Sequence, residues 1–216
     1  MIRMAVAPSP LSALRRFAKP RPVVERCELC GLELPKEHQH LLEPANRKLL
    51  CACDACAILF DTGENGRFRR IPRRIRKLVD FQITDEQWAG LHLPINLAFI
   101  YRSTPAKRVI AMYPSPAGAT ESLLNLESWD ELIAVNPILR EMQPDVESLL
   151  INRVGDERHY WMAPIDECFR LVGVIRGSWR GLSGGHEVWG KIKDFFDDLG
   201  KRGSEVRVEG DGGQRA

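Results

Sequence analysis

Two Cys-X-X-Cys pairs constrain what this chain can fold into more than any other feature of its sequence. Cys27 and Cys30 form the first pair, Cys53 and Cys56 form the second, and 22 residues separate the two pairs. Two thiolates spaced in this way can grip one tetrahedral ion, and two such pairs around a hairpin complete a four-thiolate site. Without the ion, so short a segment buries too little apolar surface to fold alone. The sequence therefore predicts a metal-binding module with these four cysteines as ligands.

Zinc is the ion that this spacing favours, in a module of the zinc-ribbon or treble-clef type. The apolar residues 57–60 follow the second pair directly and predict a helical turn that begins at the thiolates, which favours the treble-clef arrangement. An iron–sulfur cluster is the alternative occupant, because such clusters also need about four thiolates.

Three further residues near the two pairs are potential ligands. Cys51 makes a fifth thiol, which we expect to lie on a strand and to point beside the metal. His38 and His40 are expected in a polar turn, and His40 is the better spare ligand because two leucines follow it. Cys51 and His40 therefore remain alternates for the site. The sixth cysteine, Cys168, stands alone in an apolar segment and is expected to be a core residue.

The composition is that of a globular protein. Hydrophobic residues make up 44% and charged residues 28%, which excludes wholesale disorder. No apolar run approaches the roughly 18 residues that span a bilayer, so we expect no membrane association. The first residues contain prolines and arginines in place of a continuous apolar stretch, so we expect no export signal and a cytoplasmic location.

The chain is expected to consist of a small module followed by an α+β domain with hairpins first and helices last. We expect a tether over residues 1–24, the cysteine-rich module with a basic strand over 25–80, the α+β domain over 81–200 and a disordered tail over 201–216.

Within the larger domain, short-range patterns predict the elements. Buried strands are predicted at residues 95–103, 107–115, 146–154 and 159–165, a Pro/Gly loop at 114–124, and helices at 167–179 and 187–199. Thr84 with Gln87 is a capping box that begins a short helix, and Ser128 is the expected N-cap of another.

A basic segment connects the two parts. Seven of the eleven residues from Arg67 to Lys77 are basic, and Pro72 argues against a helix there. Such a strand can bind phosphates. The favoured interpretation is an edge strand whose charges prevent self-pairing, because Phe68 is the only aromatic residue nearby.

Four stretches of the sequence resemble a family of uncharacterised bacterial proteins with a cysteine-rich, zinc-ribbon-like amino-terminal end. They are ERCELCGLELPKEHQHLL, LLCACDACAILF, MYPSPAGATESLL and SWRGLSGGHEVWGKIKDFF, and the similarity runs from about Arg16 to Leu199. The residues that match the family pattern include Cys27, Cys30, His40, Cys51, Cys53 and Cys56. The resemblance implies a gene often found near those of [NiFe] hydrogenases and their maturation proteins, without implying a reaction.

These features together predict a non-enzymatic accessory protein with a structural zinc site. No nucleophile–base pair is recognisable in residues 81–199. The expected partner is another protein, a hydrogenase subunit or a maturation factor. The alternatives are an iron–sulfur electron-transfer or metal-delivery protein, and a zinc-dependent regulator that binds nucleic acid through the basic strand.

Overall fold

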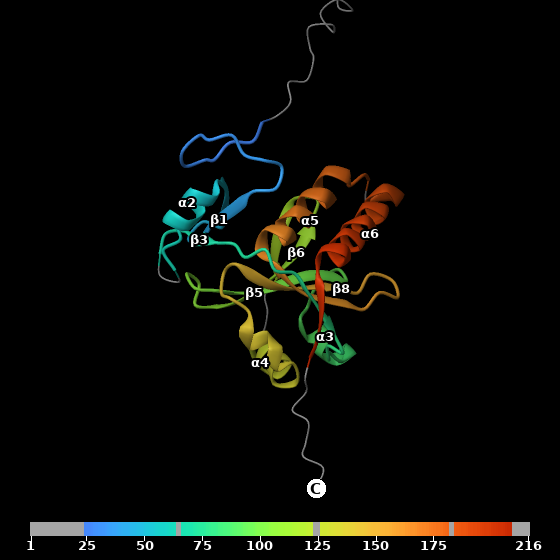
Figure 1. The fold of residues 1–216 in the computed structure, drawn as a ribbon. Coiled ribbons are helices and arrows are strands. Elements are labelled where there is room, and N and C mark those ends of the chain that lie inside the picture. Colours follow the sequence, from blue (N-terminus) through green and yellow to red (C-terminus); the bar gives the residue numbers. More distant parts are fainter. Residues whose placement is uncertain (1–23, 64–65, 123–125, 182–183, 209–216) are drawn as a thin grey trace, which may run out of the picture.

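The computed structural model describes residues 24–63, 66–122, 126–181 and 184–208, and it confirms the predicted α+β class. Two sheets and five α-helices make up this part of the chain (Figure 1). Residues 1–23 of the tether predicted over 1–24 lie outside the described residues, as do residues 209–216 of the predicted tail.

A three-stranded sheet forms the smaller part. Its strands are β1 (Gln39–Glu43), β2 (Lys48–Ala52) and β3 (Arg69–Arg70), in the order β2-β1-β3, and all pairs are antiparallel. The helix α2 (Asp54–Leu59) follows β2 directly. A separate small apolar core, which includes Leu41, Leu50 and Ala57, holds this part together.

A seven-stranded sheet forms the larger part, in the order β10-β4-β9-β8-β5-β6-β7. Its strands are β4 (Arg76–Val79), β5 (Leu97–Ser103), β6 (Arg108–Ser115), β7 (Gly118–Ser122), β8 (Glu147–Asn152), β9 (His159–Pro164) and β10 (Ser204–Arg207). The pairs are antiparallel except β10 with β4, which is parallel.

Helices cover both faces of the large sheet (Figure 1). The helices α5 (Ile165–Ser178) and α6 (Gly185–Arg202) lie on one face, and α3 (Asp85–Gly90), α4 (Leu126–Val135) and the 3-10 helix η1 (Pro137–Glu141) lie on the other. Side chains alternate along a strand, so Phe99 of β5 packs with α5 while its neighbour Ile100 packs with α4. The continuous apolar run in this strand thus reflects burial on both faces.

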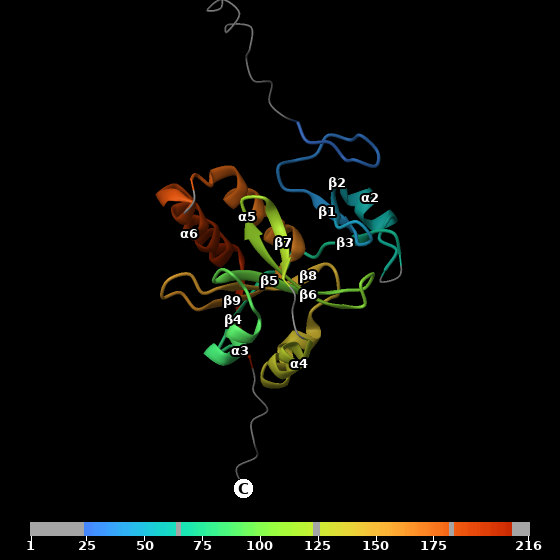
Figure 2. The ribbon, with the colours of Figure 1, turned by 180° about the vertical axis from the view of Figure 1, so that it is seen from behind.

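The small sheet lies beside α5, on the side away from α6, as the views from both directions show (Figure 2). Both faces of β1 are buried there. Leu41 belongs to the small core, whereas Leu42 belongs to the core between the large sheet and α5. The cysteine-rich part is therefore packed against the α+β domain.

Several local predictions are correct. Thr84 and Gln87 form the expected capping box, with Thr84 Oγ1 accepting from the Gln87 backbone N–H at 3.1 Å. The predicted strands within 95–103 and 107–115 are present, as is the hairpin of β8 and β9.

Other predictions are wrong, mainly where pairing overrides local composition. Residues 118–122, predicted as loop, form β7 because β6 offers them a partner. The helix predicted from Ser128 already includes Leu126. The disordered tail predicted over 201–216 is wrong for its first residues, since α6 reaches Arg202 and β10 follows.

The basic segment is also more than the edge strand that was predicted. Its first part, β3, lies at an edge of the small sheet, but its second part, β4, is paired on both sides, by β9 and β10.

Across the described ranges, no helix is long and apolar enough to cross a membrane.

Candidate metal centre

The first cysteine pair lies on a tight turn that is closed by its own backbone. The Gly31 N–H donates to the Cys27 carbonyl at 2.8 Å, and the Cys27 N–H donates to the Leu32 carbonyl at 2.8 Å. Gly31 has a φ of +76°, which a side chain would disfavour, so glycine suits this turn. The turn is tied to β2 by the Glu28 N–H, which donates to the Cys51 carbonyl at 2.9 Å.

The second pair lies at the start of α2. Cys53 is the N-cap residue, and its Sγ accepts a hydrogen bond from the Cys56 backbone N–H at 3.4 Å. This geometry places both sulfurs at the end of the helix where backbone N–H groups are unpaired, which favours negative charge on sulfur. The helix predicted after Cys56 is thus present, although it begins at Asp54.

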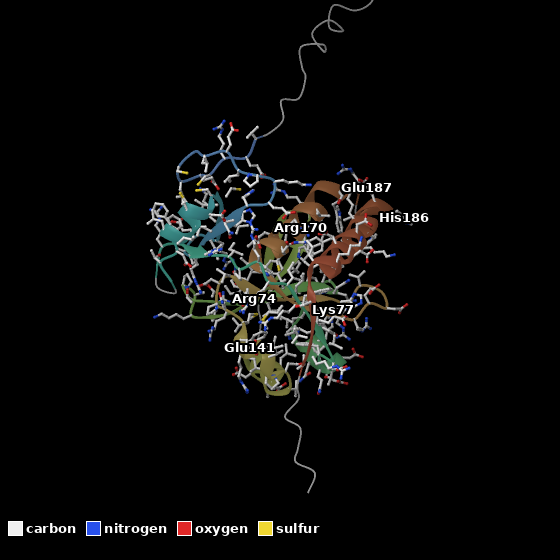
Figure 3. The ribbon with its side chains drawn as sticks, viewed as in Figure 1. Arg74, Lys77, Glu141, Arg170, His186 and Glu187 are labelled. Carbon is white, nitrogen blue, oxygen red and sulfur yellow. The ribbon has the colours of Figure 1, made fainter. Side chains whose placement is uncertain are left out.

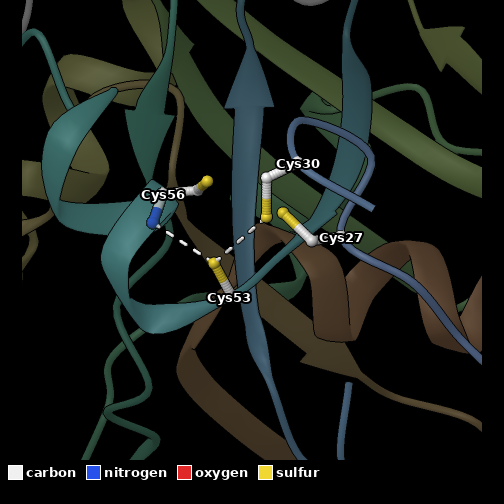
Figure 4. A group of neighbouring side chains, drawn as sticks. All are labelled: Cys27, Cys30, Cys53 and Cys56. Atoms are coloured by element: carbon white, nitrogen blue, oxygen red, sulfur yellow. Dashed lines mark hydrogen bonds between the residues drawn. The ribbon is translucent and has the colours of Figure 1, made fainter. Parts of the chain in front are cut away.

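The side chains of the four predicted ligands point toward one another and form one cluster (Figure 4). Their sulfurs all lie within 4.8 Å of one another, and those of Cys30 and Cys53 are 3.8 Å apart. Cys27, Cys53 and Cys56 are buried in the small core, whereas Cys30 is exposed. The sequence spacing therefore identified residues that the fold brings together.

The pKa values of the clustered thiols are shifted in opposite directions. Burial raises the pKa of Cys27, but hydrogen bonds with the backbone of Cys53, Leu29 and Cys30 outweigh it and bring that pKa down to about 6. Burial, together with the neighbouring thiols, raises the pKa of Cys56 to about 12. Four sulfurs this close cannot all ionise without a positive charge between them. A tetra-cysteine cluster of this kind can hold a metal ion, and its donor set suits a soft or borderline one.

Cys51, His40 and His38 are not part of this cluster. Side chains alternate along β2, so Leu50 and Ala52 face the small core while Cys51 points to the opposite face. Cys51 pairs in register with His40, and these two residues form a separate group with His38. In this structure the alternates predicted for the four-cysteine site lie together on the other face of the hairpin.

A sequence signal for this grouping exists, but it depends on the hairpin register. The loop of residues 44–47 pairs Glu43 with Lys48 and hence His40 with Cys51. The loop length was not recognisable from the sequence because no Asn-Gly or similar turn pair marks it. A fourth residue, Asp166, contacts His40 from α5 and had no sequence signal, since 126 positions separate the two.

The basic segment is largely neutralised by carboxylates of the domain and the module. The ion pairs are Arg67–Glu43, Arg69–Asp145, Arg74–Glu147, Arg76–Glu141 and Lys77–Glu205. Figure 3 shows Arg74 and Lys77 on this segment, with Glu141 farther down the same view. Five of the seven basic side chains therefore form ion pairs within the chain.

One family model matches this chain, described as "Family of unknown function (DUF5947)", over residues 26–203. The match begins at the first cysteine turn and ends after α6, so it covers the cysteine module and most of the α+β domain as one unit. No curated protein and no solved structure matches the chain significantly.

Proposed function

The chain belongs to the DUF5947 family, and we propose that it is a non-enzymatic accessory protein whose cysteine cluster binds a structural zinc ion and whose cysteine module contacts a partner protein. The observation that carries the proposal is the cluster itself. Its four sulfurs lie within 4.8 Å of one another, and three of them are buried in the core of the module.

A structural role for the ion follows from the ligand set. Four protein thiolates fill a tetrahedral shell and leave no position for a substrate, which is typical of structural zinc. The small core consists of few large side chains, and three of the four cysteines belong to it. Metal binding and folding of this module are therefore coupled.

Exposed apolar side chains on the module support a role in protein contacts. Ile58 and Leu59 on α2 are 67% and 74% exposed, and Leu32 beside the first cysteine turn is 58% exposed. Exposed apolar residues that gather on one small element favour a protein partner. On the domain, Trp189 of α6 is 43% exposed and adds a second potential anchor.

The cellular process in which this contact takes part is inferred from the family resemblance alone. The family that the sequence resembles implies bacterial genes that neighbour those for [NiFe] hydrogenases. We therefore place the protein in the assembly or maturation of such an enzyme, in the cytoplasm, with a hydrogenase subunit or a maturation factor as its partner.

Gene deletion in a host with a [NiFe] hydrogenase tests this role. Hydrogen uptake should fall while transcripts of the structural subunits stay unchanged, and the wild-type gene should restore uptake. An Ile58→Glu/Leu59→Glu variant should fold but fail to restore it, whereas Val135→Glu, on α4 and 37% exposed, should succeed. Unchanged hydrogen uptake after deletion would contradict the proposal.

The two alternative functions, an iron–sulfur protein and a nucleic-acid-binding regulator, depend on the cysteine cluster and on the basic segment respectively. Four thiolates also suit an iron–sulfur cluster, which would serve electron transfer or metal delivery and would absorb visible light. A nucleic-acid regulator would need free cationic side chains, and most of those between Arg67 and Lys77 have carboxylate partners. A salt-dependent gel shift would favour that regulator.

A further inference from the structure

Three metal-ligating side chains meet on the face of the β1–β2 hairpin that is turned toward α5. His40 and Cys51 are register partners, and His38, two residues before His40, lies beside them. One ligand atom from each of the three lies within 4.8 Å of the other two, and the two imidazole rings meet edge to face with centroids 4.8 Å apart. Imidazole and thiolate are donors that borderline divalent ions prefer.

The His38 side chain is buried and has one nitrogen without a protein partner. Only 6% of this side chain is exposed. Its Nδ1 lies 3.0 Å from the Pro35 carbonyl oxygen, which can only accept, so Nδ1 carries the proton and donates. Nε2 then carries a lone pair, and no described residue donates to it. A buried acceptor without a partner is destabilising, and a bound metal ion would remove that penalty.

His40 is oriented by a carboxylate from the other part of the molecule. Its Nδ1 lies 2.7 Å from Asp166 Oδ2, so the ring donates there and leaves its Nε2 lone pair free. Asp166 is itself fixed, because its Oδ1 accepts from the Glu167 backbone N–H at 2.9 Å. A carboxylate behind a histidine is the usual arrangement around ligating histidines, since it sets the tautomer and strengthens the ligand.

Carboxylates lie close to the group. Glu25 Oε2 lies 3.5 Å from His38 Nδ1, and Glu28 Oε2 accepts from the Cys51 backbone N–H at 2.8 Å. Together with Asp166, these carboxylates favour a cation at this place.

The group also borders a pocket between the module and the two helices α5 and α6. The pocket has a volume of about 530 Å³, and His38, His40 and Asp166 line it together with Arg73, Arg170 and Arg202. Arg170 lies on α5 (Figure 3), and its Nη2 donates to Asp198 Oδ2 of α6 at 3.0 Å. A small ligand that enters this pocket would reach the two histidines.

We propose that His38, His40 and Cys51 form a second metal site, separate from the four-cysteine cluster, which binds a divalent ion of the zinc type. His38 and His40 bind through Nε2, Cys51 binds as thiolate, and Asp166 positions His40. Three protein ligands leave a fourth position open toward the pocket, as in zinc sites that bind an exchangeable ligand. Arg170 and Arg202, which line the same pocket, are bound to Glu167 and Asp198, so the lining of the pocket holds both signs of charge.

Metal counting on single variants tests the second site. The chain is freed of loosely held metal and titrated with Zn²⁺, and bound zinc is measured by elemental analysis. Wild type should bind two zinc ions per chain, and His38→Ala and Cys51→Ser should each bind one. His159→Ala is the matched control, since this partly exposed histidine lies on β9, and it should bind two. Asp166→Asn should keep both sites but weaken the second by about 10–100-fold.

A measurement on the wild-type chain covers the case in which a variant fails to fold. The ¹⁵N shifts of the imidazole rings report which nitrogen binds metal. Zinc should move Nε2 of both His38 and His40 to a metal-bound position while Nδ1 stays protonated. Binding of only one zinc ion by wild type and by Cys51→Ser alike, or histidine shifts that zinc leaves unchanged, would overturn the proposal. Neither outcome would affect the four-cysteine site or the partner contact proposed above.

Discussion

Arg74 binds the carboxylate of Glu147 with two hydrogen bonds, from Nε to Oε1 at 2.6 Å and from Nη2 to Oε2 at 2.9 Å. The Glu147 side chain has no exposed surface. In the sequence, Arg74 lies between β3 of the small sheet and β4 of the large sheet. Glu147 is the first residue of β8, the central strand of the large sheet. This pair therefore anchors the connection between the module and the α+β domain.

Arg74→Met should destabilise the protein by about 3 kcal/mol, because it leaves a buried carboxylate without its counter-charge. Arg73→Met is the matched control, since Arg73 is exposed and forms no ion pair within the described ranges. Its effect should stay within about 0.5 kcal/mol. Urea unfolding at saturating zinc measures both, and equal effects of the two variants would contradict the role of Arg74.

Glu121 should make stability depend on pH in the acid range. Burial raises the pKa of Glu121, but hydrogen bonds and charges from Arg108 and Arg47 outweigh it and hold that pKa below its usual range. A carboxyl with a lowered pKa in the folded state stabilises the fold above its unfolded pKa, and this gain is lost as pH falls through the folded pKa.

Glu121→Gln should therefore cost about 0.5 kcal/mol at pH 7, and the difference from wild type should vanish below the folded pKa. The exposed Glu131, changed to Gln, serves as control and should show no such trend. Unfolding free energies of the three chains across the acid range provide the comparison. A difference that persists undiminished at the lowest pH would show that Glu121 does not act through its charge.

Cys168 should be unreactive while the protein is folded. Its side chain is buried, its Sγ lies 2.9 Å from Ser148 Oγ, and burial raises the pKa of the thiol. Because the thiolate is the reactive form, an alkylating agent should modify Cys168 only after denaturation. Mass spectrometry of labelled native and denatured protein checks this, and rapid labelling of Cys168 in the native protein would contradict the described burial.

The sequence predicted what local patterns determine. The spacing of Cys27, Cys30, Cys53 and Cys56 depends on the chemistry of one ion, and the structure brings these residues together. The capping box depends on two residues three positions apart, Thr84 and Gln87, and it is present. Strands such as β5 were recognisable because burial on both faces requires a continuous apolar run.

Features that depend on distant partners were not predictable. The residues of β10 are mostly exposed and carry no apolar pattern, and they form a strand because β4 lies beside them. Glycine and threonine in β7 gave the appearance of a loop. Likewise, the contact of His40 with Asp166 exists only once the hairpin is packed on α5.

The cysteine ligands should differ in their importance for folding. Cys30→Ser should unfold the module, because it removes a ligand from the four-thiolate site that supports the small core. Cys51→Ser should leave the module folded, since Cys51 points to the opposite face of the hairpin. Circular dichroism and limited proteolysis distinguish the two variants. Equal unfolding in both would require Cys51 to be a ligand of the same ion.

The metal content of anaerobically purified Cys51→Ser protein tests the central claim most directly, because this variant keeps all four ligands of the cysteine cluster and lacks the fifth thiol. The account predicts a colourless protein with about one zinc ion per chain, since two cysteine pairs supply one tetrahedral set. A brown protein that contains iron and sulfide, or a folded protein that retains no metal, would contradict it.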